Sequence, residues 1–217
     1  MFWLGWRKGM VRRSRALLAS RRMWRMRLVF WCGALAIGVV ATVFAYASDA
    51  AQHLFFLLTD PRTGPWLPLL MTPAGFVACA VIAERFFPGS QGSGIPQAMA
   101  ARRLEGRARF TYLTIRIAIG KFVLTVMGLL CGASIGREGP TVQIGAALMM
   151  LSARLGGMSD ARGLILAGSA AGIAAAFNTP LAGIVFAIEE LGRAYSARTN
   201  GLVLSAVIIA GIASLGL

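Results

Sequence analysis

Long apolar stretches, separated by short polar breaks, run through most of this chain. Residues 28–47 contain no charged side chain, and at about 1.5 Å per helical residue such a stretch covers the roughly 30 Å of a bilayer core. Residues 66–83 and 111–135 form two further long apolar runs, and the turn-forming residues between 48 and 65 predict a loop after the first run. The pattern predicts an all-α, polytopic membrane protein.

Shorter apolar segments follow breaks that are rich in glycine or proline, at residues 88–96, 136–140 and 178–180. Irregular backbone at membrane depth is stable only where protein buries it or where it lines a watery cavity. Short, interrupted segments in a membrane protein indicate a transporter's binding site. The breaks therefore predict tilted and half-spanning helices with a site beside them.

The composition agrees with a membrane protein. Hydrophobic residues make up 57% of the chain and charged residues 14%, whereas soluble domains carry about 25% charged residues. An intrinsically disordered chain would be poor in hydrophobic residues, so that class is excluded. The same composition argues against a cytosolic enzyme.

Basic residues gather in the first 27 positions, which contain nine Lys or Arg and no acid; the whole chain has a formal charge of +14. Trp3, Trp6 and Trp24 are interleaved with them. This segment is typical of an interfacial anchor on anionic headgroups that keeps the N-terminus in the cytoplasm. A nucleic-acid-binding arm is one alternative, and a cleaved signal peptide is another, although the apolar run is longer than a signal needs.

The cysteines and the histidine indicate no cofactor. Cys32, Cys79 and Cys131 are scattered through apolar stretches without paired spacing, and His53 stands alone. We therefore expect no disulfide framework and no metal site.

The first break, residues 92–96, suits an anion. Its glycines allow close approach of the backbone, Ser93 offers a hydroxyl, and Pro96 fits the first turn of a helix. The start of a helix presents unpaired N–H groups and a positive dipole end, which attract anions. The alternative is a plain turn that begins a helix.

The second break, residues 136–140, has the same glycine and proline pattern with an acid added. Glu138 would stand where an anion would bind, so it could compete with the anion and leave when protonated. An acid in a membrane segment costs about 2.5–3.5 kcal/mol on insertion scales, which favours a functional role. The alternative is a simple helix cap.

Other charged residues lie within or next to apolar runs. Glu189 and Glu190 end the segment that follows the third break, where the helix dipole disfavours acids. They either face water or handle protons. Lys121 is a candidate counter-charge for an anion pathway, or else the partner of a nearby acid.

Together these motifs resemble the CLC family of chloride channels and proton/chloride antiporters. The matching motifs occupy residues 92–96, 136–145 and 175–190, and the resemblance covers about residues 28–217. It implies a basic cytoplasmic segment at 1–27 and, at 28–217, a membrane domain that is the first of two inverted repeats of the CLC fold. The Gly-x-Phe-x-Pro motif of the family's second half is absent, so we expect the anion site in this sequence to be incomplete. Because the sequence stops inside an apolar run, we also expect a chain truncated at its C-terminus.

The resemblance also implies residue roles. Glu138 would be the gate and the external proton glutamate, Glu190 the internal proton glutamate, and Lys121 a buried lysine near the anion path. The implied anion-binding residues are Ser93, Gly94, Ile95, Gly136, Arg137 and Gly139.

The implied function is chloride transport, coupled to protons, by a non-enzymatic protein. Serine at position 93, where nitrate-preferring relatives carry proline, leans toward chloride. Chloride and protons would be the substrates, no cofactor or nucleic acid is expected, and the full-length protein would be a homodimer, in a bacterial inner membrane. The alternatives are a chloride channel of the same family and a non-transporting half that needs a partner.

Overall fold

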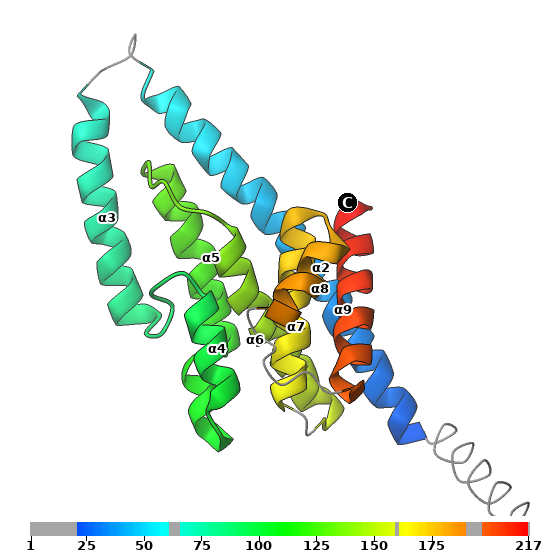
Figure 1. The fold of residues 1–217 in the computed structure, drawn as a ribbon. Coiled ribbons are helices and arrows are strands. Elements are labelled where there is room, and N and C mark those ends of the chain that lie inside the picture. Colours follow the sequence, from blue (N-terminus) through cyan, green and yellow to red (C-terminus); the bar gives the residue numbers. More distant parts are fainter. Residues whose placement is uncertain (1–20, 61–65, 159–160, 190–196, 217) are drawn as a thin grey trace, which may run out of the picture.

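The computed structural model describes residues 21–60, 66–158, 161–189 and 197–216, and the secondary structure of this part is entirely helical (Figure 1). In chain order the elements are α2 (Arg21–Leu58), α3 (Leu67–Phe86), α4 (Ile95–Arg103), the 3-10 helix η1 (Gly106–Thr111), α5 (Ile115–Leu130), α6 (Glu138–Gly156), α7 (Ala161–Phe177), α8 (Pro180–Glu189) and α9 (Ala197–Leu215). The prediction of an all-α architecture is confirmed.

Within the residues that the structure describes, three helical stretches are long and apolar enough to cross a membrane. They are Met23–Leu58, Leu67–Phe86 and Ala108–Leu130. The three long runs are therefore confirmed as candidate spans by length and composition. The first and third breaks lead, as expected, into short helices, α4 with 9 residues and α8 with 10. The second break leads into α6, which has 19 residues, so the expectation of a short helix was wrong there.

One expectation was wrong. Residues 48–58 form the last turns of α2 and not a loop. No proline or glycine occurs there to stop a helix, and Ser48 is buried while the exposed Asp49 pairs with Arg137. Ser48 and Asp49 therefore lie on a continuous helix, where the first is buried and the second forms an ion pair.

Small residues let the central helices approach closely. A Cβ atom built on Gly145 of α6 would lie 2.4 Å from the carbonyl oxygen of Gly168 on α7, and one built on Gly172 would lie 2.5 Å from that of Thr141. Packing through small residues is the usual way for helices to associate in a membrane. α7 thus forms a buried centre that α2, α6 and α9 surround (Figure 1).

Helix α3 stands apart at one edge and packs on α5 (Figure 1). Large apolar side chains cover its surface, and Leu69 and Leu70 are 68% and 74% exposed. An apolar surface of this extent marks contact with lipid or with another protein segment.

Candidate functional site

The first candidate helix start is built around Gly94, the residue before α4. Its φ of 112° lies in a region that side chains rarely adopt, which explains the glycine. The Gly94 N–H donates to Gln97 Oε1 at 2.9 Å, and Gln97 Nε2 donates to the Gln91 carbonyl at 2.6 Å. Gln97 therefore caps the helix and fixes the loop that leads into it.

Lys121 of α5 holds the same loop from behind. Its ammonium donates to the carbonyl oxygens of Ser90 at 2.5 Å and Gly92 at 2.6 Å, and its side chain is only 3% exposed. It forms no ion pair in the described part of the chain, so the alternative of an acid partner finds no support there. Its role as a counter-charge near the anion path stays a prediction.

The second candidate helix start is the first turn of α6. Glu138 is its first residue and is partly buried. Its carboxylate lies against Gly136: a Cβ atom built on that glycine would be 2.4 Å from Glu138 Oε2. The acid thus stays at the positive end of the helix dipole.

Arg137 precedes α6 and reaches toward α2. Its Nη1 donates to Asp49 Oδ1 at 2.7 Å and to the Ala45 carbonyl at 3.3 Å. The guanidinium therefore joins the start of α6 to the long helix through Nη1.

The structure brings the two helix starts into direct backbone contact. A Cβ built on Gly94 would lie 2.3 Å from the Gly139 carbonyl oxygen, and one built on Gly139 would lie 2.6 Å from that of Ser93. Ser93 and Gly136 are exposed, whereas Ile95 is partly buried as the first residue of α4. Two motifs that are far apart in sequence therefore place the N-terminal ends of α4 and α6 side by side.

One supporting residue was missed in the sequence. Gln143 of α6 is fully buried, and its Nε2 donates to the carbonyls of Tyr112 at 3.0 Å and Gly89 at 3.3 Å. It joins α6 to the loop before α4 and to the residues before α5. The available signal was an amide side chain in an otherwise apolar helix, which in a membrane protein points to a specific contact.

The third break ends α7 at Asn178, whose φ of 52° is left-handed. The Thr179 N–H donates to the Ala174 carbonyl at 3.0 Å, and α8 begins at Pro180, as in a usual helix C-cap. Glu189 is the exposed last residue of α8. Glu190, the predicted internal proton glutamate, lies outside the described residues.

Comparison with known proteins identifies relatives of this chain. The family model described as voltage gated chloride channel matches residues 74–217. The H(+)/Cl(-) exchange transporter ClcA of Vibrio cholerae serotype O1 is 35% identical over 197 residues, which is 83% of this chain and 40% of that protein.

Solved structures give the same relationship. A slow cyanobacterial Cl-/H+ antiporter superposes with a TM-score of 0.74 at 26% identity, over 88% of this chain and 46% of its own. A eukaryotic CLC transporter superposes with a TM-score of 0.73 at 24% identity, over 87% of this chain and 38% of its own. The likeness establishes the fold, and this chain spans less than half the length of the relatives it matches.

Proposed function

The chain belongs to the voltage gated chloride channel family, and from this premise we propose that it supplies part of a chloride pathway in a proton-coupled antiporter. Within that proposal, residues 28–217 form the first of two inverted repeats, and the full-length protein is a homodimer with chloride and protons as its substrates. The names of the relatives, an exchange transporter and an antiporter, support the coupled mode.

The contact between the starts of α4 and α6 is the observation that carries the proposal. Each helix end offers unpaired N–H groups and about half a positive charge, so an anion beside Ser93 and Gly139 would meet both. Gln97, Lys121 and Gln143 fix the surrounding backbone through hydrogen bonds. Donors that are already oriented bind an anion without the cost of ordering a flexible loop.

Glu138 supplies the proposed gate. Its carboxylate stands at the start of α6, where a bound anion would also be favoured. Two negative charges in one place repel, so the anion and the ionised acid exclude each other. Protonation removes the charge of the acid and lets chloride take the position, which links the two movements. Glu190 is the proposed acid for the inner proton step.

The flux experiment uses the full-length protein in liposomes, with chloride efflux and external pH recorded together. Antiport predicts that protons move against the chloride flow, and that a chloride gradient drives them uphill. Glu138→Gln should keep chloride efflux and lose the proton movement. Glu105→Gln is the control, because that acid is exposed and pairs with Arg162, another exposed residue.

Other results would overturn the proposal. Chloride efflux without proton movement in the unaltered protein would indicate a channel of the same family. Absence of any chloride flux would indicate a protein that does not transport. Proton coupling that survives Glu138→Gln would remove that residue from the mechanism.

We also infer that the N-terminus faces the cytoplasm, in a bacterial inner membrane. Cytoplasmic segments of membrane proteins are enriched in Lys and Arg, and residues 1–27 carry nine of them. Arg102 at the end of α4 lies close to Arg162 of α7 and to Arg103, and burial together with these two positive neighbours lowers the pKa of Arg102. This second basic group supports the same orientation.

A further inference from the structure

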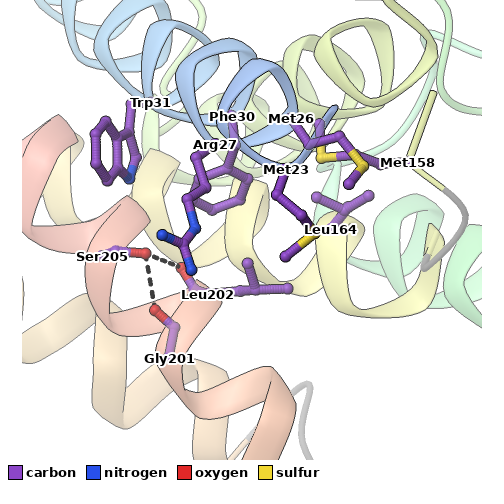
Figure 2. Close-up of a pocket in the computed structure, with 10 residues that line it drawn as sticks. All are labelled: Met23, Met26, Arg27, Phe30, Trp31, Met158, Leu164, Gly201, Leu202 and Ser205. Atoms are coloured by element: carbon purple, nitrogen blue, oxygen red, sulfur yellow. Dashed lines mark hydrogen bonds between the residues drawn. The ribbon is translucent and has the colours of Figure 1, made fainter. Parts of the chain in front are cut away.

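A hollow of about 600 Å³ lies where the first turns of α2 meet α7 and α9, away from the two helix starts (Figure 2). Its walls are mainly apolar and include Met23, Met26 and Phe30 of α2, Leu164 of α7 and Leu202 of α9. The volume lies within the range of about 300–1,000 Å³ that is typical of ligand sites. Methionine side chains adapt readily to flexible apolar ligands.

Arg27 is the charged residue among the described residues that line the hollow. Figure 2 shows its side chain extending from α2 toward the first turns of α9. It lies near the ring of Trp24, with its guanidinium carbon 5.9 Å from the ring centre, and forms no ion pair within the described residues. Among the described residues, the hollow therefore presents a positive charge without a matching acid beside an apolar trough.

The position of Arg27 on α2 indicates the level at which the hollow lies in a bilayer. It is the last charged residue before the uncharged stretch 28–47, so it lies where headgroups give way to hydrocarbon. Trp24 and Trp31 on the same helix are 48% and 40% exposed, as is usual for aromatic residues at a membrane interface. A molecule in the hollow would thus have its polar end at the level of the lipid phosphates.

We propose that this hollow binds one anionic phospholipid from the leaflet on the side of the N-terminus. The phosphate contacts Arg27, and an acyl chain lies against Met23, Met26 and Leu202. An anionic lipid has a net negative charge that matches the positive charge of Arg27, whereas a zwitterionic lipid has no net charge. The basic segment 1–20 is a poor occupant for the same reason, since it carries positive charges and no acid.

The test measures lipid binding to the full-length protein in detergent by native mass spectrometry. The probes are phosphatidylglycerol and phosphatidylcholine with identical acyl chains. Arg27→Gln should raise the Kd for phosphatidylglycerol about tenfold or more, because a hydrogen bond to a charged group is lost. It should raise the Kd for phosphatidylcholine less, because the choline cation already offsets the phosphate charge of that lipid. Arg25→Gln is the matched control: this exposed arginine does not line the hollow, so its loss should change neither Kd more than about twofold.

A second variant tests the apolar trough. Gly201 lines the hollow, and a Cβ atom built on it meets no atom within 4 Å. Gly201→Phe should therefore fill the space without disturbing the fold, and should weaken binding of both lipids.

Four outcomes would overturn the proposal. They are equal losses in Arg25→Gln and Arg27→Gln, unchanged binding in Gly201→Phe, displacement of the lipid by millimolar inorganic phosphate, and no lipid binding by the unaltered protein. The last result would mean that another part of the full-length protein covers the hollow. None of these measurements depends on chloride transport, so the two proposals fail independently.

Discussion

Replacing Gly139 by alanine places a methyl group at the contact between the two helix starts. The added Cβ would lie 2.6 Å from the Ser93 carbonyl oxygen, where ordinary contacts begin at 3.4 Å. The starts of α4 and α6 must therefore separate by about 0.8 Å, the difference between these two distances. The two nearest atoms, the carbonyl oxygen and carbon of Ser93, belong to the backbone, so the strain cannot be relieved by turning a side chain.

The expected cost has two parts. Overpacking of this kind destabilises a protein by about 1–3 kcal/mol, whereas glycine to alanine in a helix gains about 0.5–1 kcal/mol. Gly201→Ala in α9 measures the second part alone, because a Cβ there meets no atom within 4 Å. The free energy of unfolding of Gly139→Ala should therefore fall about 1–3 kcal/mol below that of Gly201→Ala.

Chloride affinity is the decisive measurement, made by isothermal titration calorimetry on the full-length protein. Loss of one hydrogen bond to an ion costs about 1.5–3 kcal/mol, which corresponds to a chloride Kd roughly 10–100 times higher. Gly201→Ala should keep the Kd of the unaltered protein. A folded Gly139→Ala protein that binds chloride within about twofold of the unaltered one would refute the assignment of the anion to this contact.

Two further predictions concern Lys121 and the basic segment. Lys121→Met removes the two hydrogen bonds that hold the loop before α4. The rate of hydrogen exchange of the amides in residues 89–94 should therefore rise about tenfold or more. An unchanged rate would show that the lysine does not order this loop. Trypsin added to sealed inverted vesicles should cleave within residues 1–20, where five basic residues offer cleavage sites. Cleavage in right-side-out vesicles alone would reverse the proposed orientation.

Local signals in the sequence were sufficient to locate the helix starts. Glycines followed by Pro96 and Pro140 predicted where the two helices begin, and α4 and α6 start at Ile95 and Glu138. Proline in the first turn and glycine before it act through the backbone of their immediate neighbours. These signals therefore predict where a helix begins without knowledge of its tertiary contacts.

Tertiary contacts limited what could be predicted. A glycine at 139 indicates that something approaches closely, but the partner, Ser93, is determined by how α4 and α6 pack. The turn-forming residues between 48 and 65 predict a loop that begins at residue 48, because the ion pair of Asp49 with Arg137 is invisible in the sequence. Lys121 could be recognised as a buried charge, whereas its two carbonyl partners depend on the path of the preceding loop.

Because Lys121 donates to backbone carbonyls, its charge need not contact an anion in the proposed site, and this affects the rate at which the anion leaves. Two helix ends of about half a charge each already provide roughly one unit of positive charge. A direct ammonium contact at 4 Å would add about 4 kcal/mol at an effective dielectric constant of 20, and would slow release roughly a thousandfold. Conduction requires binding weak enough for the ion to leave. A lysine that orders the loop by donating to its carbonyls, while the helix ends contact the anion, meets that requirement.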